Sequence, residues 1–314
     1  MTGRVVTIGE GLGVLRAPAP GIAHAGSLEI GTGGAEGNVA IGLARLGVDV
    51  TWLGRIGRDG LGTRVIRELR AENVHAIGIE DDAATGLIIK EWPSPGRTRV
   101  TYYRSGSAGS RLTPADVELA DIPSAALLHL TGITPALSTS ALEAVRRAIA
   151  IAEASGVPIS FDVNYRSALW TPDAASAVCA ELAAHATVVF AGDDEARLLT
   201  GLASDSPAEL ARAITRGATT EVVIKRGEHG AWALVGGEDF EVAATPVTVV
   251  DTVGAGDAFV AGYLAERLAG HPVAERLRVG ALAGALACTG AGDWESLPTR
   301  ADLEREHGSD PVAR

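Results

Sequence analysis

Short runs of β-branched residues alternate with longer Ala- and Leu-rich stretches along most of this chain. This alternation is typical of βαβ units, in which helices cover both faces of a mostly parallel sheet. The sequence therefore predicts a three-layer α/β/α fold. Its expected strands are 5–9, 48–53, 127–131, 158–162, 187–191, 221–225 and 246–251. Its expected helices include 38–46, 61–73, 140–155, 208–216 and 258–268.

The composition fits one large domain or two ordinary ones. Of the 314 residues, 46% are hydrophobic and 21% are charged, so the chain can bury a sizeable core. The formal net charge of -12 argues against a nucleic-acid partner, because phosphate backbones are bound by clustered Lys and Arg. Lys90 and Lys225 are the only lysines. Because the protein as a whole is negatively charged, an anionic substrate would have to bind to positive groups placed in the site itself.

Segments for secretion, membrane anchoring or metal binding are not evident. No stretch is apolar enough for a signal sequence or a membrane span, which predicts a cytoplasmic protein with no membrane partner. Cys179 and Cys288 lie far apart, and they support neither a disulfide framework nor a thiolate zinc site. The histidines show no metal-ligand spacing.

One section breaks the alternation of strands and helices. Residues 85–104 form two β-rich runs around Pro93-Ser94-Pro95-Gly96, a turn cluster that suits a hairpin. The section is too short and too polar for a core of its own, so we expect it to form a lid on the main sheet. The predicted boundaries are 1–305 for the main domain, 12–32 and 84–106 for the lid inserted in it, and 306–314 for a C-terminal tail.

The strongest local feature is the run Asp251-Thr-Val-Gly-Ala-Gly-Asp-Ala-Phe259, which precedes an amphipathic helix. Gly254, Ala255 and Gly256 would turn the chain sharply and direct unpaired amides to one point. Because the positive end of the helix lies there, the turn suits an anion hole for a phosphoryl group. Asp257 would stand beside the hole, where it could accept a hydroxyl proton. On the residues alone, a purely structural glycine turn is the commoner interpretation.

Two other classes of glycine loop can be tested on the same letters. A dinucleotide fingerprint needs GxGxxG, but Phe259 stands three positions after Gly256. A P-loop needs GxxxxGK[ST], and neither lysine has that context. The dehydrogenase and P-loop hypotheses therefore both fail.

The 251–259 segment resembles the C-terminal signature of the PfkB, or ribokinase-like, carbohydrate kinases. Gly33-Gly-Ala-Glu-Gly-Asn-Val-Ala40, followed by the glycine-rich 53–62, resembles the N-terminal one. Two signatures in the right order are more specific than either alone, and the resemblance extends from about Val5 to about Leu303. It implies a ribokinase-like fold with a small β-sheet lid, and phosphoryl transfer that uses ATP and Mg²⁺.

The resemblance also implies roles for single residues. Asp257 would be the catalytic base, beside the anion hole of the glycine turn. Gly33 and Gly34 would let a sugar approach the backbone closely. Asn38 stands at an expected helix start, where capping and a hydrogen bond to a sugar hydroxyl are equally compatible with the residue. The resemblance favours the sugar.

Two further segments give the expected ATP site. Lys225-Arg-Gly-Glu-His-Gly230 resembles the family's KxGxxG segment, so Lys225, Gly227 and Gly230 would meet the nucleotide. Gly192-Asp-Asp-Glu195 aligns with the NxxE motif, but Gly192 stands where the family has Asn. Glu195 remains a candidate for organising Mg²⁺ through water. A hairpin-edge lysine and a solvated glutamate are the structural alternatives.

The lid and the strand ends point to the acceptor. Period-two alternation along the second lid strand gives one face to Thr98, Val100, Tyr102 and Arg104. Arg166 follows an expected strand, at the edge where open α/β sheets bind ligands. An arginine offers a planar, bidentate partner to a carboxylate, which a neutral sugar does not need.

The pieces 102–112, 129–137 and 162–166 together resemble 2-keto-3-deoxygluconate kinases. In that subfamily the arginines matching Arg104 and Arg166 hold the substrate carboxylate. Asn164 borders the nucleotide there, and the acidic residue matching Asp293 approaches the sugar. The resemblance thus implies phosphorylation of the terminal hydroxyl of 2-keto-3-deoxygluconate to give 2-keto-3-deoxy-6-phosphogluconate.

Two other functions stay open. A fructokinase- or ribokinase-like kinase of a neutral sugar has the same signatures, and the paired arginines argue against it. A non-catalytic sugar or nucleotide sensor has the same scaffold, and the intact Asp257 turn argues against it. We also expect a homo-oligomer that forms through the lid, because an exposed sheet with apolar strands often finds a partner chain.

Overall fold

The structure of the chain, a computed structural model, describes residues 3–19, 21–94 and 97–307, with no side chains described for 92–94, 97–98 and 306–307. The strands are β1 (Val5–Ile8), β2 (Leu12–Ala17), β3 (Glu29–Gly33), β4 (Val50–Gly57), β5 (His75–Asp81), β6 (Gly86–Ser94), β7 (Arg97–Tyr103), β8 (Leu127–Thr131), β9 (Ile159–Asp162), β10 (Val188–Gly192), β11 (Glu221–Lys225), β12 (Ala231–Val235) and β13 (Glu238–Val242). The α-helices are α1 (Ala35–Arg45), α2 (Gly60–Ala71), α3 (Pro114–Val117), α4 (Thr139–Ala154), α5 (Pro172–Ala183), α6 (Asp193–Thr200), α7 (Pro207–Ile214), α8 (Ala255–Leu268), α9 (Val273–Ala287) and α10 (Arg300–His307). Short 3-10 turns lie at Gly109–Arg111, Glu118–Ala120, Ile122–Ser124, Thr134–Ala136 and Gly227–His229.

In the described part of the chain, the main sheet has nine strands in the order β13-β12-β11-β10-β9-β8-β1-β4-β5. Its pairs are parallel except where the hairpin β12–β13 adds two antiparallel strands at one edge. The hairpin turns at Gly236 and Gly237, whose φ angles of 59° and 89° suit a tight two-residue turn. The predicted mostly parallel α/β fold is confirmed.

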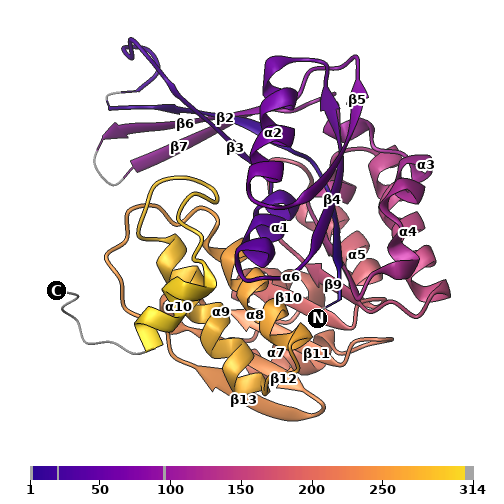
Figure 1. Cartoon of the computed structure of the whole chain (residues 1–314). Coiled ribbons are helices and arrows are strands. Elements are labelled where there is room, and N and C mark those ends of the chain that lie inside the picture. Colours follow the sequence, from indigo (N-terminus) through magenta and orange to yellow (C-terminus); the bar gives the residue numbers. More distant parts are fainter. Residues whose placement is uncertain (1–2, 20, 95–96, 308–314) are drawn as a thin grey trace.

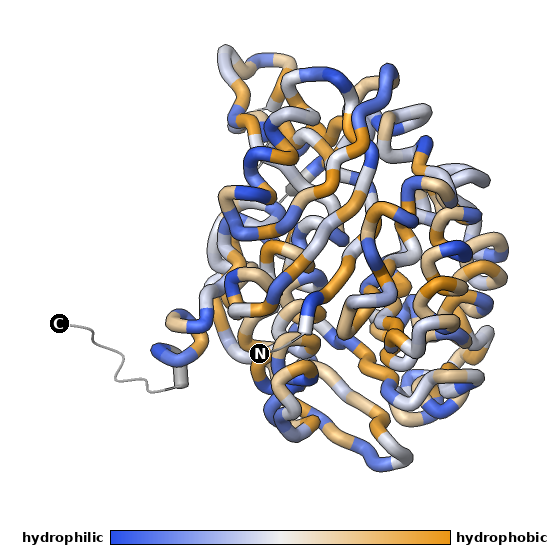
Figure 2. The backbone as a smooth tube through the Cα atoms, turned by 45° about the vertical axis from the view of Figure 1, so that its right-hand side comes forward, coloured by the Kyte–Doolittle hydropathy of each residue, from blue (hydrophilic) through white to orange (hydrophobic). Residues whose placement is uncertain are grey.

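Helices cover both faces of this sheet (Figure 1). Because side chains alternate along a strand, Val5 packs into a core with α1, α8 and α9, whereas Val6 packs into a second core with α4 and α5. Figure 2 shows hydrophobic and hydrophilic segments alternating along the helical coils, as expected for helices with one buried side. The two cores give the three predicted layers.

A second sheet, which we call the lid, has the strand order β3-β2-β6-β7. It projects from the main body at the upper left of Figure 1. Strands β2 and β6 pair in parallel, and the flanking strands β3 and β7 are antiparallel to them. The predicted small β-sheet lid is confirmed, with strands at 12–17, 29–33, 86–94 and 97–103, although Pro95 and Gly96 of its expected turn lie outside the described residues.

One predicted strand is absent, and one strand was not predicted. The strand expected at 246–251 is absent, and Val249 and Val250 are 59% and 58% exposed in an irregular segment that leads to α8. Strand β5 was not expected, because its polar residues at an exposed sheet edge lack the apolar run of a central strand. Helix α10 ends at His307, and 308–314 of the predicted tail lie outside the described residues.

The chain order places one crevice at the middle of the main sheet. Strands β1, β4 and β5 extend from the centre to one side, and β8, β9, β10 and β11 extend to the other. In open α/β sheets, ligands bind at the carboxyl ends of the strands where the order reverses. We therefore expect the site beyond the ends of β1, β8 and β9.

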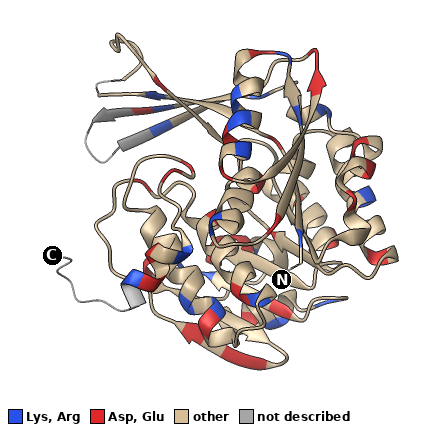
Figure 3. Ribbon diagram, viewed as in Figure 1, with Lys and Arg blue, Asp and Glu red and all other residues tan. Residues whose placement is uncertain are grey.

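Basic residues are not confined to one helix or strand. Figure 3 shows basic residues spread over several elements rather than gathered on one of them. Within residues 3–19, 21–94 and 97–307, no helix is long and apolar enough to cross a membrane.

Gly34, at the junction of β3 and α1, should be far less replaceable than Gly47. Its φ is 130°, and an added Cβ would lie 2.2 Å from the carbonyl oxygen of Glu10, whereas Gly47 has φ 84° and open space around it. We expect Gly34→Ala to lower the free energy of unfolding by about 3 kcal/mol and Gly47→Ala by about 1 kcal/mol. Urea unfolding would measure both values, and equal losses would contradict the steric argument.

Candidate active site

The carboxyl ends of the parallel strands and the lid enclose a cavity of about 760 Å³. Most of the predicted site residues line it: Gly34, Asn38, Tyr102, Arg104, Asn164, Arg166, Glu195, Lys225, Gly254, Gly256, Asp257 and Asp293. The predicted residues that do not line it are Gly33, Ala255, Gly227 and Gly230. Residues that were predicted from distant segments of the chain therefore lie around one space.

Asp257 lies in the first turn of α8, which begins after Gly254 in the left-handed conformation with φ 79°. First-turn amides have no acceptor within the helix, so those of Gly256 and Asp257 are available to an anion. The amide of Ala255 is different, because it donates to the carbonyl of Thr252 at 3.3 Å. The expectation that all of 254–256 present unpaired amides is therefore wrong for Ala255.

Asn38 reaches Asp257 from α1. Its Nδ2 donates to Oδ2 of Asp257 at 2.7 Å, and its Oδ1 is buried without a partner among the described residues. Helix α1 begins at Ala35 with Gly34 as its N-cap, so the capping role considered for Asn38 is wrong. The unpaired Oδ1 is an acceptor that no described residue uses.

Burial controls the protonation of Asp257. The carboxyl is 7% exposed, and burial raises its pKa from the ordinary 3.8 to about 7. The hydrogen bond from Asn38 and the charges of Arg166 and Lys225 act in the opposite direction, while the negative charge of Asp162 adds to the rise. A carboxylate whose pKa lies near neutral pH is well suited to take up a proton during a reaction.

Lys225, at the end of β11, forms an ion pair with a buried carboxylate. Its Nζ lies 2.8 and 2.7 Å from the two oxygens of Asp162, at the end of β9. Burial opposes the charge of Lys225, but the attraction of Asp162 raises its pKa. The lysine therefore stays charged beneath the glycine turn, with most of its charge balanced by Asp162.

Tyr102 and Arg104 point the same way, as predicted, with the Arg104 guanidinium carbon 5.7 Å from the centre of the Tyr102 ring. The side chain of Thr98 lies outside the described residues. Arg104 is 8% exposed, and its Nε donates to Oε2 of Glu10 at 2.8 Å. Ser107 also donates to Glu10. The charge of Arg104 is therefore already balanced by a buried carboxylate.

Arg166 is the exception among the cations of the cavity. Its side chain donates to the carbonyl oxygen of Tyr165 at 3.2 Å, and no carboxylate in the described part of the chain forms an ion pair with it. It follows Asn164, which has the positive φ of 41°. A carboxylate of a ligand can therefore bind this guanidinium without displacing a protein partner.

Glu195 holds the loop of Arg166 in place. Its Oε1 accepts from the amide of Tyr165 at 2.8 Å, and its Oε2 accepts from the amide of Gly192 at 2.7 Å. The described residues contain no group of three metal-binding side chains. Glu195 lines the cavity and each of its oxygens can accept one further hydrogen bond, so the residue could hold Mg²⁺ through a water molecule.

Several residues of the cavity were not predicted from the sequence. Glu10 follows β1, Asp162 ends β9 and Glu36 lies in the first turn of α1, where Thr131 and Thr134 donate to it. The signal that could have found Glu10 and Asp162 is their place, since both are acidic residues at the carboxyl end of a buried strand.

The comparison with protein families decides the identity of the fold and the site. Residues 3–300 match the model of the pfkB family carbohydrate kinases. The chain belongs to this family. As a pfkB kinase, it is an enzyme of carbohydrate phosphorylation, and the predicted family resemblance is confirmed.

Three curated relatives of this pfkB kinase are similar over most of its length. A 2-dehydro-3-deoxygluconokinase of Bacillus subtilis is 38% identical over 305 residues, which cover 95% of this chain and 93% of the relative. A 2-dehydro-3-deoxygalactonokinase of Haloferax volcanii is 36% identical, with 97% and 96% covered. A fructokinase of Klebsiella pneumoniae is 35% identical, with 87% and 91% covered.

Solved structures show the same fold. The 2-dehydro-3-deoxygluconokinase of Thermotoga maritima has a TM-score of 0.89 at 26% identity and covers 98% of this chain and 99% of its own. A putative ribokinase II of E. coli in complex with ATP and Mg²⁺ has a TM-score of 0.88 at 26% identity, with 97% and 99% covered. The ribokinase-like fold with its lid is therefore confirmed.

The raised pKa of Asp257 predicts that Asp257→Asn stabilises the kinase at alkaline pH. Between the ordinary pKa and about 7, the folded protein binds a proton that the unfolded chain has released, so stability falls as pH rises through this range. We expect Asp257→Asn to be about 2–4 kcal/mol more stable than the wild type at pH 8, with a smaller difference at pH 5. Chemical unfolding at several pH values would measure this.

Asp116→Asn is the control with the opposite sign. Although burial opposes it, Arg55 holds the pKa of Asp116 below its ordinary value. Loss of this carboxylate should therefore destabilise the protein at pH 8. An Asp257→Asn protein that is less stable than the wild type at pH 8 would contradict the assigned cause of the shift.

Proposed function

We propose that this pfkB kinase transfers the γ-phosphoryl group of ATP to the terminal hydroxyl of 2-keto-3-deoxygluconate. The product would be 2-keto-3-deoxy-6-phosphogluconate. The observation that supports an acidic acceptor is the unpaired guanidinium of Arg166, which faces the same cavity as Asp257. The names of the bacterial and archaeal relatives, which act on 2-dehydro-3-deoxy sugar acids, favour the same substrate class.

Asp257 is the proposed base. Its pKa of about 7 means that the carboxylate is substantially ionised at neutral pH and still gains a proton readily. The amides at the start of α8 would stabilise the charge of the transferred phosphoryl group. Asn38 would fix the Asp257 carboxylate through Nδ2 and orient a sugar hydroxyl through Oδ1.

The nucleotide and the metal ion are part of the same proposal. ATP would lie toward Lys225, Asn164 and the turn at Gly227 and Gly230, beside the Gly254 turn. Glu195 would hold Mg²⁺ through water, and Mg²⁺ supplies positive charge that neutralises the transferred phosphates. The E. coli structure in complex with ATP and Mg²⁺ supports the use of this nucleotide and metal ion by the kinase.

A neutral sugar such as fructose is the second candidate. The observation that favours it is the ion pair between Arg104 and Glu10, because an arginine with a balanced charge attracts a substrate carboxylate less strongly. The fructokinase relative points the same way. Asp293 lines the cavity and Gly33 lies directly behind it, and the proposed contacts of both with the acceptor do not require a carboxylate on the sugar.

The assembly and the location of the enzyme also stay predictions. Ile30 and Tyr103 on the outer side of the lid are 45% and 60% exposed, which supports a homo-oligomer through this sheet. A cytoplasmic location rests on the sequence alone.

A panel of acceptors tests the substrate class. ADP release should be measured with keto-deoxy sugar acids, fructose, ribose and nucleosides, and we expect turnover with the sugar acids. Arg166→Ala should raise the KM for the sugar acid by about a hundredfold, from the loss of a charged hydrogen bond, and should leave any use of fructose within about threefold. Turnover with neutral sugars alone would overturn the proposal, and equal losses on both substrates would remove the role of Arg166.

Asp257→Asn tests the base. Asparagine keeps the shape and a hydrogen bond to Asn38 but cannot accept the hydroxyl proton. We expect kcat to fall by about 10³-fold or more, with ATP binding measured by calorimetry unchanged. A rate within about tenfold of the wild type would show that another group acts as the base.

A further inference from the structure

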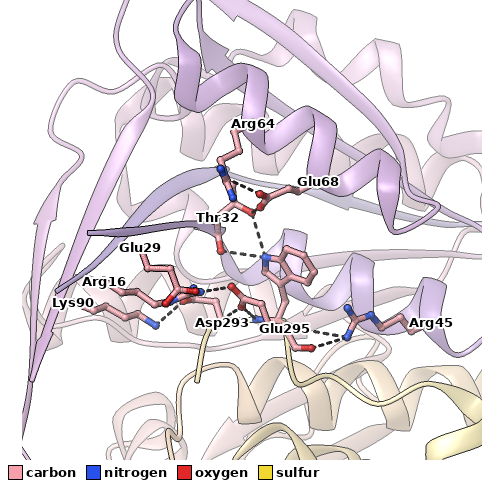
Figure 4. Close-up of polar contacts among 10 residues, drawn as sticks. Arg16, Glu29, Thr32, Arg45, Arg64, Glu68, Lys90, Asp293 and Glu295 are labelled. Carbon is pink, nitrogen blue, oxygen red and sulfur yellow. Dashed lines mark hydrogen bonds and ion pairs between the residues drawn. The ribbon is translucent and has the colours of Figure 1, made fainter. Parts of the chain in front are cut away.

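A ladder of charged residues crosses the inner face of the lid. Arg16 on β2 is the register partner of Glu29 on β3 and of Lys90 on β6, so the three side chains share one face. Arg16 and Lys90 are 5% and 1% exposed. Both cations extend toward Asp293 and Glu295, in the loop that follows α9 (Figure 4).

That loop presents two carboxylates to the lid. Lys90 lies 2.6 Å from Oδ1 of Asp293, and Arg16 pairs with Oε1 of Glu295. The negative charge of Glu295 acts on Asp293, as does the positive charge of Arg16. Burial and the neighbouring Glu295 both disfavour the charge of Asp293, whereas Lys90 and Arg16 favour it, so this arrangement of the loop depends on the two lid cations.

Glu295 also shapes the backbone of the loop. Its Oε2 accepts from the amides of Asp293 at 2.9 Å and of Trp294 at 3.2 Å. The turn passes through Gly292, whose φ is 126°. Glu295 therefore contacts the lid through Oε1 and the turn through Oε2. This turn directs Asp293 into the cavity.

The same turn touches the phosphoryl-transfer site. The carbonyl oxygen of Asp293 lies 2.0 Å from the point that a Cβ on Gly254 would occupy, so the backbone of the loop packs directly on the N-cap of α8. A displacement of Asp293 would move a wall of the sugar cavity. It would also move Gly254, the N-cap of α8.

We propose that Arg16 and Glu295 are positioning residues that make the geometry at Asp293 and Gly254 depend on the position of the lid. With the lid closed, Arg16 and Lys90 neutralise Glu295 and Asp293, and the turn is held against Gly254. With the lid displaced, the loop loses both cations, and the turn no longer supports the start of α8. The proposal rests on the kinase activity of the family and not on which sugar is the acceptor.

Trp294 and Arg45 also hold the loop in place, but they do not make its geometry depend on the charges of the lid. The indole of Trp294 donates to the carbonyl and the hydroxyl of Thr32 at 3.1 and 3.2 Å. Arg45 on α1 donates to the carbonyl oxygens of Trp294, Glu295 and Leu297. Neither residue contacts the carboxylates of Asp293 and Glu295, so their charge is balanced only from the lid among the described residues.

Arg16→Met and Glu295→Gln test the proposal singly and together. Each single variant should raise the KM for the accepted sugar by about tenfold and lower kcat several-fold, with the KM for ATP within about twofold of the wild type. Because the two residues act as one unit, the double variant should lose no more than the worse single variant. Arg16→Lys, which keeps the charge, should recover most of the activity.

Arg267→Met is the matched control. Arg267 pairs with Glu221 at 2.9 Å, at the opposite end of the main sheet from the cavity, and its side chain is 18% exposed. This variant should lower Tm but leave both KM values and kcat unchanged. If Arg16→Met behaves like Arg267→Met, or if the losses of the two single variants multiply in the double variant, the positioning role is wrong.

Hydrogen exchange separates this proposal from the choice of substrate. Mass spectrometry on the protein without any sugar should show faster amide exchange at 291–297 and at 252–258 in Arg16→Met, and unchanged exchange there in Arg267→Met. This readout holds even if no acceptor of the panel is phosphorylated. Unchanged exchange at 252–258 in Arg16→Met would overturn the link to Gly254.

Discussion

Burial of the Asp257 carboxyl is the constraint around which the cavity is arranged. A carboxylate in a nearly water-free place is unfavourable, which is why its pKa rises to about 7, and its neighbours determine how far. Asn38 and the positive charges of Lys225 and Arg166 keep the ionised form accessible, while Asp162 limits it. A buried carboxyl of this kind needs a structure that is stable enough to tolerate the cost of its burial, and the two cores on either face of the sheet supply that stability.

Charge balance explains how the remaining polar groups can share the same space. Lys225 is matched by Asp162, Arg104 by Glu10 and Lys90 by Asp293, each through a direct contact. Buried pairs add little net stability compared with apolar packing, but removal of one partner is costly, so each pair fixes two elements relative to each other. Because the pairs join β11 to β9 and the lid to the main body, they hold the walls of the cavity together in this structure.

The sequence predicted those parts of the site whose chemistry is local. The turn before Asp257, the lid segments and the position of Arg166 all depend on residues that are close in the chain, and each is where it was expected. Glu10 and Asp162 were not predicted: their places at strand ends can be read from the sequence, but their pairing with Arg104 and Lys225 joins distant segments and cannot. The wrong prediction of a strand at 246–251 also reflects missing tertiary information, since valines that favour strands also occur in an exposed irregular segment.

The scarcity of lysine has a chemical consequence for the folded enzyme. Lys90 has a side chain that is 2% exposed and Lys225 one that is 18% exposed, and each ammonium group is held by an aspartate. A protonated amine in an ion pair is a poor nucleophile, so reagents that attack lysine find no reactive side-chain amine on the closed protein. The rate of amine modification therefore reports how often two ion pairs open, that of Lys90 in the lid and that of Lys225 at the end of β11.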